Sequence, residues 1–280
     1  MPPARVILWL CARQELRLAV RSRSTQIFTA VFAVLALVVA SSGYVLSGGS
    51  GVQDFSRTAV SLVQLVLLLV PLTSLVFGVL TVTPETGAAE LMFSQPISRR
   101  TILAGRLLGV FLALVSSQSI GFGAAGIVLF MRTGPDGAAG FLGVVGGSIV
   151  LTAVFIGLAA LVAAGDATAR RARNLGLALV IWFFAVVLFD VAALGVASLL
   201  PSGMASRVLM VAAVVNPVDA VRTGALLILE GPAAFGAASL AFLRFTGGAI
   251  GAAVWLSLSM VVWVLAPIAA AIARLNRADI

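Results

Sequence analysis

Residues 59–82 read AVSLVQLVLLLVPLTSLVFGVLTV, and this stretch decides the fold class of the chain. It carries no charged side chain and is longer than the about 20 residues with which a helix crosses the hydrocarbon core of a bilayer. The sequence therefore predicts an all-α, polytopic membrane protein in which residues 1–280 form a single membrane domain. Six stretches meet the length criterion, and we place the transmembrane spans at 26–47, 59–82, 101–130, 141–164, 174–200 and 248–273.

The composition of the whole chain agrees with this fold class. Hydrophobic residues make up 61% of the 280 residues and charged residues 10%, whereas about 25% charge is usual in soluble domains. All basic residues are arginine. Without lysine the chain has no ordinary P-loop, and without histidine it has no His-based metal site, catalytic triad or proton shuttle. We expect no catalytic residue, no metal site and no bound cofactor, so that any ATP is hydrolysed elsewhere.

The arginines predict the orientation in the membrane. A net charge of +8 would suit a nucleic-acid partner, but these arginines lie in short connections beside apolar stretches, so we expect no nucleic acid. Thirteen of the eighteen fall on one predicted side of the bilayer. By the positive-inside rule both termini are cytosolic, residues 84–100 face the cytosol and residues 201–247 face outward.

Residues 208–229 are long enough for a seventh span, but they contain Asn216, Pro217, Asp219 and Arg222. At mid-bilayer each charge would cost about 3 kcal/mol, and the proline would remove a backbone donor. We therefore expect a re-entrant or surface-lying helical hairpin on the outer side, broken at Asn216 and Pro217. Two roles for it stay open: a capped structural turn, or a gate or docking point for an outer partner.

Asp190 is the only acid deep within a predicted span. At 1.5 Å per residue it lies about 24 Å along the helix that begins at Asn174, beyond the midplane toward the outer side. Since an ionised carboxylate cannot face lipid, we expect it to face the bundle, a partner helix or a polar cavity. A hydrogen-bonded tie between helices is favoured over a role in a substrate path. One acid alone also disfavours an intramembrane enzyme.

Residues 1–25 predict an amphipathic interfacial helix along the inner leaflet, with a basic anchor that only sets topology as an equal alternative. Its polar residues include Arg13, Glu15, Arg17 and Arg21. Two G-x-x-x-G spacings in later spans permit close helix contact. They are formed by Gly105 with Gly109 and by Gly143 with Gly147.

The cytosolic segment 84–100 surrounds an apolar patch with charges. The patch consists of Leu91, Met92 and Phe93, and the charged residues are Glu85, Glu90, Arg99 and Arg100. A helix of this kind can place its apolar side chains in the groove of a partner while the charges fix its orientation. The alternative is a solvated loop whose arginines set topology.

These segments resemble type 2 ABC exporter permeases. Residues 12–16, ARQEL, are similar to the interfacial helix that opens such permeases, and residues 85–99, ETGAAELMFSQPISR, to their ATPase-contacting coupling helix between spans two and three. More narrowly, the pattern W-F-x(5)-F-D at 182–190 and the pattern N-P-x-D-x-x-R at 216–222 resemble the permease subunits of the transporter that matures nitrous oxide reductase.

The resemblance implies a homodimer in a bacterial or archaeal cytoplasmic membrane, bound to two cytosolic ABC ATPase subunits that hold ATP and Mg²⁺. A periplasmic accessory protein is a further implied partner. The implied function is to couple ATP hydrolysis to export, or to mechanical rearrangement of a periplasmic partner, in copper-enzyme maturation. Two alternatives stay open: an efflux permease for a lipid, drug or peptide, and a non-transporting assembly scaffold.

Overall fold

The computed structural model describes residues 3–47, 51–83, 98–133, 138–164, 171–231 and 237–277. Within these ranges every regular element is a helix, which confirms the all-α prediction. Six helices are long and apolar enough to cross a membrane, in agreement with the predicted number. Residues 84–97, which include most of the predicted coupling segment, lie outside the described residues.

The candidate spans are formed by long helices. They are α2 (Arg23–Ser47), α3 (Gly51–Val82), α5 (Arg99–Thr133), α6 (Ala138–Ala163), the continuous series α7 (Arg171–Phe183), η2 (Phe184–Leu188) and α8 (Phe189–Ser198), and α12 (Ala249–Arg277). We refer to the α7–η2–α8 series as span five. Four shorter helices complete the described fold: α1 (Ala4–Arg21), α9 (Ser202–Val215), α10 (Pro217–Glu230) and α11 (Ala237–Thr246).

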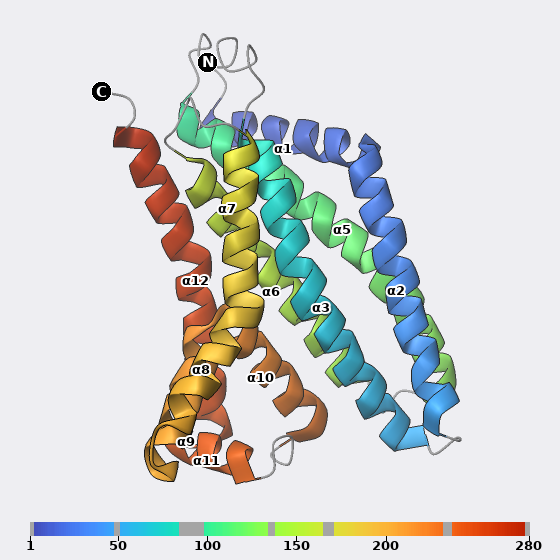
Figure 1. The fold of residues 1–280 in the computed structure, drawn as a ribbon. Helices are drawn as coiled ribbons and strands as arrows, with labels where there is room; N and C mark the ends of the chain where they lie inside the picture. Colours follow the sequence, from blue (N-terminus) through green and yellow to red (C-terminus); the bar gives the residue numbers. More distant parts are fainter. Residues whose placement is uncertain are drawn as a thin grey trace.

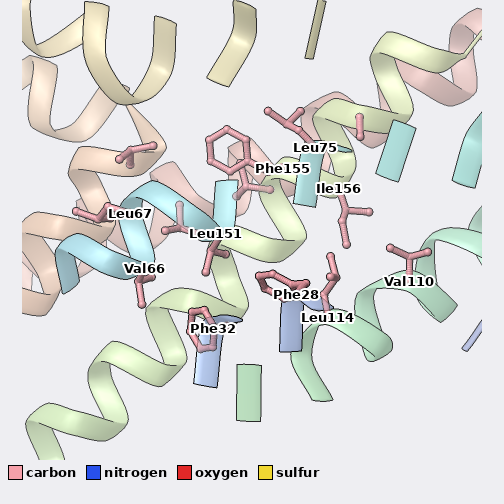
Figure 2. Packing of buried hydrophobic residues seen from close by; sticks show 14 of the residues in the cluster. Phe28, Phe32, Val66, Leu67, Leu75, Val110, Leu114, Leu151, Phe155 and Ile156 are labelled. Carbon is pink, nitrogen blue, oxygen red and sulfur yellow. The ribbon is translucent and has the colours of Figure 1, made fainter. Parts of the chain in front are cut away.

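The core lies between α2, α3, α5 and α6. Figure 2 shows Phe32 of α2, Leu114 of α5, and Leu151 and Phe155 of α6 among its members, all of which are fully buried. The ring of Phe32 meets that of Phe122 edge to face, with centroids 5.2 Å apart. Such a pair contributes about 1 kcal/mol beyond the area that it buries.

Polar side chains tie α5 to α6 inside this core. The Gln118 amide donates to the Thr152 hydroxyl at 2.9 Å, and its carbonyl accepts from the Ser148 hydroxyl at 2.8 Å. All three residues are buried. Because lipid tails are as apolar as leucine side chains, interhelical hydrogen bonds and close packing hold a membrane bundle together.

Helix α1 lies across one end of the bundle, and α12 ends at that same end (Figure 1). We call it the α1 end. The structure contains no membrane, so the predicted location of α1 along the inner leaflet stays a prediction. Helices α9 and α11 lie at the opposite end, which we call the α9 end (Figure 1).

Helices α9 and α10 are bent by 100° at a one-residue break. Asn216 at the break is extended, and its side-chain carbonyl accepts from the Val218 N–H at 3.1 Å. Pro217 opens α10, where the missing N–H of a proline costs nothing. Asparagine followed by proline therefore ends one helix and begins the next.

Both ends of this bent pair lie at the α9 end. Helix α9 follows directly on α8, and α10 runs beside the first half of α6, where Val221 meets Gly147 and Ile228 meets Gly143. Length and composition alone would also allow the pair to be a seventh, broken span. The contacts with α6 favour a re-entrant hairpin, which stays a prediction.

Candidate functional site

Arg222 of α10 faces two carboxylates at the α9 end of the bundle. Its Nη1 donates to Oδ2 of Asp190 at 2.7 Å and lies 2.8 Å from Oδ1 of Asp219. Asp190 stands in the first turn of α8, and Asp219 lies three residues before Arg222 on α10. The structure thus joins the acid of span five to the hairpin through one guanidinium, and we call these three residues the charge cluster.

Asn216 extends this cluster to the backbone of span five. Its amide nitrogen donates to Oδ2 of Asp219 at 3.0 Å and to the carbonyl of Ala185 at 2.8 Å. Only 3% of Asn216 and 7% of Asp219 are exposed. The side-chain oxygen of Asn216 therefore caps α10, and its side-chain nitrogen holds the hairpin against span five.

Span five contains a π-turn where it receives Asn216. The N–H of Phe189 donates to the carbonyl of Phe184, five residues back, and the segment 184–188 is π-helical. Such turns insert one residue into a helix and are frequent at functional sites. Since one extra residue in a regular helix would rotate α8 by about 100°, the π-turn keeps Asp190 directed at Arg222 by taking up that residue.

Trp182, from the pattern W-F-x(5)-F-D at 182–190, anchors span five to α3. Trp182 donates from its indole nitrogen to the carbonyl of Leu68 on α3 at 3.1 Å. Closer to the α1 end, the Asn174 amide lies 3.3 Å from the Thr83 hydroxyl at the end of α3. Span five is thus held at two depths by α3.

The bend of the hairpin is fixed by α12. The Trp263 indole donates to the carbonyl of Val215 at 2.7 Å, and the Ser259 hydroxyl donates to the carbonyl of Val214. These carbonyls belong to the last turn of α9, where no intrahelical donor is available. Because Trp263 lies near the middle of α12, the bend reaches well into the bundle.

A cavity of about 700 Å³ adjoins the charge cluster. Its polar wall contains the three cluster residues, and much of the remaining wall is apolar, including Leu194 and Phe242. Such a volume is within the range of small-molecule sites. Two buried polar atoms of the cluster make no well-aligned hydrogen bond: Oδ1 of Asp219, despite its short distance from Arg222, and Nε of Arg222.

At the α1 end, helix α1 is seated directly on the start of α5. A Cβ atom at Gly105 would lie 2.6 Å from Cβ of Cys11, and one at Gly109 would lie 2.5 Å from Cβ of Glu15. Arg106 donates to Glu15 at 3.3 Å, and both side chains are less than a quarter exposed. The first G-x-x-x-G spacing, Gly105 with Gly109, therefore packs against α1. The second, Gly143 with Gly147, packs against α10.

The other residues predicted at this end are placed only in part. The side chains of Arg13, Arg17 and Arg21 are exposed on α1, and Arg100 is exposed in the first turn of α5. The remaining coupling residues fall outside the described structure: Glu85, Glu90, Leu91, Met92 and Phe93, together with the side chain of Arg99.

Sequence reasoning missed the pairing of Asp190 with Arg222. The two residues were assigned to separate elements, 32 positions apart. The available signal was electrostatic: an acid buried in a span requires a counter-charge, and Arg222 is an arginine within an apolar segment of the same predicted half of the membrane.

Known proteins similar to this chain are membrane transport proteins. A family model described as ABC-2 family transporter protein matches residues 9–280. The chain is 30% identical over 260 residues to the probable ABC transporter permease protein NosY of Pseudomonas aeruginosa, which covers 91% of this chain and 93% of that protein. A protein of the same name from Stutzerimonas stutzeri is 30% identical over 230 residues, or 80% and 83% of the two chains.

Proposed function

The chain belongs to the ABC-2 transporter family as a transmembrane permease subunit, and from this premise we propose that it couples ATP hydrolysis to work at the outer face of the membrane. A permease subunit of an ABC transporter implies an ATPase partner. In the proposed complex the ATPase holds ATP and Mg²⁺, and this chain has no catalytic residue of its own. The α1 end faces the cytosol of a bacterial or archaeal cell, and the α9 end faces outward.

The work that we propose is maturation of a periplasmic copper enzyme, nitrous oxide reductase, by export or by mechanical rearrangement of a periplasmic partner. One observation carries this choice. The two patterns that resemble the maturation permeases, at 182–190 and 216–222, meet in one cluster through Asp190, Arg222 and Asn216. Two relatives that carry the name NosY support the same choice.

We propose two copies of the chain and two ATPase subunits in the complex. Segment 84–100 docks in a groove of the ATPase through Leu91, Met92 and Phe93. Its charged residues fix the orientation of the segment: Glu85, Glu90, Arg99 and Arg100. The segment runs directly into α5, on which α1 is seated, so its displacement would move the starts of both helices together.

A continuous series of contacts supports transmission from this end to the charge cluster. Gln118 of α5 bonds to Thr152 of α6. Gly147 of α6 packs against Val221 of α10, next to Arg222. Packed helices move as rigid elements, so a displacement of segment 84–100 by the ATPase would be transmitted to the hairpin through these contacts. We propose that the hairpin then acts on the outer partner.

The docking of segment 84–100 is tested with Phe93→Asp, with Phe93→Leu as its matched control. Aspartate places a charge in the apolar patch, so we expect the ATPase to be lost from the purified permease, whereas leucine retains it. Co-purification from detergent and ATP hydrolysis by the purified complex are the two measurements. Retention of both by Phe93→Asp would refute the docking.

The copper-enzyme role is tested in the host cell. We expect deletion of the gene to leave nitrous oxide reductase in the periplasm but without its copper, measured by metal analysis of the purified enzyme. Normal copper content, together with an intact permease–ATPase complex, would favour the efflux alternative. If no ATPase co-purified with the wild-type chain, the scaffold alternative would stand instead.

A further inference from the structure

We propose that the charge cluster binds one proton, which the carboxyl group of Asp219 holds against the carboxylate of Asp190, and that this proton fastens the hairpin to span five. A proton bound in this way is compatible with maturation of an outer enzyme and with efflux alike. The site is therefore independent of the proposed function.

The hydrogen bonds of Asp219 leave one oxygen for the proton. Oδ2 accepts from the Asn216 amide at 3.0 Å. Oδ1 is buried and accepts no well-aligned hydrogen bond from the described residues, although it lies 2.8 Å from Nη1 of Arg222. A protonated carboxyl group carries one O–H donor. A proton on Oδ1 therefore turns an acceptor that lacks a donor into a donor.

Asp190 provides the acceptor for this O–H group. Its side chain lies within hydrogen-bonding reach of Asp219, and it accepts from Nη1 of Arg222 at 2.7 Å. In the proposed arrangement Asp219 donates to Asp190, and Asp190 stays ionised in its ion pair with Arg222. Two carboxyl groups that share a site take up one proton, because the charged form of each disfavours the charged form of the other.

The proton also balances the charge of the cluster. Asp190 and Asp219 bring two negative charges and Arg222 brings one positive charge, so one bound proton makes the cluster neutral. Only 7% of Asp219 is exposed, and burial favours the neutral form of a carboxyl group. The arginine and the proton are thus the two counter-charges of the two acids.

No other charged side chain of the described residues lines the cavity at the cluster. Helix α6, which packs beside α10, carries no charged residue. The other charged side chains described on the helices around the cluster are exposed: Arg171 and Arg173 on α7, Arg207 on α9, Glu230 on α10, Arg244 on α11 and Arg274 on α12. The side chains of Asp54 and Arg57 on α3 and of Arg277 on α12 fall outside the described structure.

Asp190 gives the proton a route to Asp219. Its side chain is 33% exposed and lines the cavity of about 700 Å³, whereas Oδ1 of Asp219 is shielded. A proton from solution therefore reaches Asp190 first and passes from there to Asp219. When the proton leaves again at higher pH, two like charges face each other between α8 and α10, and the hairpin is held less firmly.

Infrared spectroscopy tests the proposal, because the C=O stretching band of a protonated carboxyl group is separate from the bands of carboxylates. The purified chain is titrated in dodecyl maltoside, a detergent without a carbonyl group. Ordinary carboxyl groups are largely ionised above about pH 5.5, so a band that persists above this pH comes from a perturbed group. Asp219→Asn is the test variant, and Glu230→Gln, which removes an exposed acid from the same helix, is its matched control.

We expect the wild-type chain to keep one such band above about pH 5.5 and to lose it at higher pH. Asp219→Asn should lack the band, and Glu230→Gln should retain it. Asp190→Asn should lose the band at least about one pH unit earlier than the wild type, because the like charge is gone and Arg222 is free to pair with Asp219. This last comparison decides on its own if the Asp219→Asn chain does not fold.

Thermal unfolding measures the hold on the hairpin. Asparagine keeps the shape of a protonated carboxyl group and supplies N–H donors, so the Asp219→Asn chain should fold. Across the pH range in which the band disappears, the unfolding temperature of the wild type should fall, and that of Asp219→Asn should fall less. The sign follows from the proton, which the folded chain binds more tightly than the unfolded chain.

A band that survives in Asp219→Asn, or no band above about pH 5.5 in the wild type, would overturn the proposal. Loss of the band at the same pH in Asp190→Asn and in the wild type would overturn it as well, because Asp190 would then have no part in holding the proton. None of these measurements uses nitrous oxide reductase or ATP hydrolysis, so the proposed function stands or falls separately.

Discussion

One guanidinium shared by two carboxylates is the feature that matters most at the scale of single residues. The side chains of Arg222 and Asp190 are 25% and 33% exposed, so solvent screens their attraction in part. Asp219 is more deeply buried. Removal of one member of the cluster changes its net charge. The loss of stability should be larger when the change leaves two carboxylates without a counter-charge than when it leaves one ion pair.

This balance predicts an order of stability among charge-neutralising variants. Asp190→Asn leaves Arg222 paired with Asp219, whereas Arg222→Gln leaves two carboxylates facing each other. We expect Arg222→Gln to lower the free energy of unfolding by about 2 kcal/mol after screening, and Asp190→Asn to lower it by less. Thermal unfolding of the purified chain in detergent gives the order.

The double variant Asp219→Asn with Arg222→Gln serves as the control, because it removes one charge of each sign. It should be more stable than Arg222→Gln alone. The reverse order would show that Arg222 does not compensate the two acids. If the Asp190→Asn variant assembles fully with the ATPase but the complex is inactive, Asp190 does more than tie two helices together.

At the scale of elements, the contact between α1 and α5 depends on two glycines. Gly109 leaves no room for a side chain, because its Cβ atom would lie 2.6 Å from the carbonyl oxygen of Ala12. Gly123 lies on the same helix with nothing within 4 Å of the corresponding position. The two glycines therefore form a matched pair for substitution.

We expect Gly109→Ala to push α1 away from α5 and to cost about 1–3 kcal/mol, the usual penalty of overpacking. Gly123→Ala should be neutral or slightly stabilising, since alanine favours a helix over glycine. Limited proteolysis in the α1 region and thermal unfolding measure both effects. Similar behaviour of the two variants would contradict the close contact.

Some features of these elements could be predicted from the sequence, and others could not. Hydropathy identified six spans, and the Asn216–Pro217 pair correctly marked a break, because both signals are local. The G-x-x-x-G spacings showed where a helix can approach but not which one, since that choice depends on tertiary packing. The π-turn in span five and the pairing of Asp190 with Arg222 were missed. A hydropathy profile reports neither the rotation of a helix about its axis nor contacts between residues far apart in the sequence.

At the scale of the whole molecule, the predicted orientation can be tested with introduced cysteines. In the C11A variant, Ser202→Cys and a cysteine at Gly231 mark the two ends of the hairpin, and Arg277→Cys marks the end of α12. We expect an impermeant maleimide to label both hairpin positions from the periplasm, and position 277 only after the cells are opened.

A seventh span would place the two hairpin positions on opposite sides of the membrane. Labelling of position 277 in intact cells would reverse the assignment of the termini. Either result would require the charge cluster to be placed at a different depth, because Asp190 and the hairpin are bonded to each other.

Because span five contains a π-turn, the orientation of Asp190 toward Arg222 depends on the number of residues in the span as well as on their chemistry. Deletion of Val187 should convert the turn into regular α-helix and still leave Asp190 facing Arg222, because the π-turn takes up one extra residue without rotating the helix that follows. Val187→Ala, which keeps the count, should leave the cluster intact. Insertion of one further residue between Trp182 and Asp190 should instead rotate α8 by about 100° and turn Asp190 away from Arg222, so it would act like the loss of a charged residue.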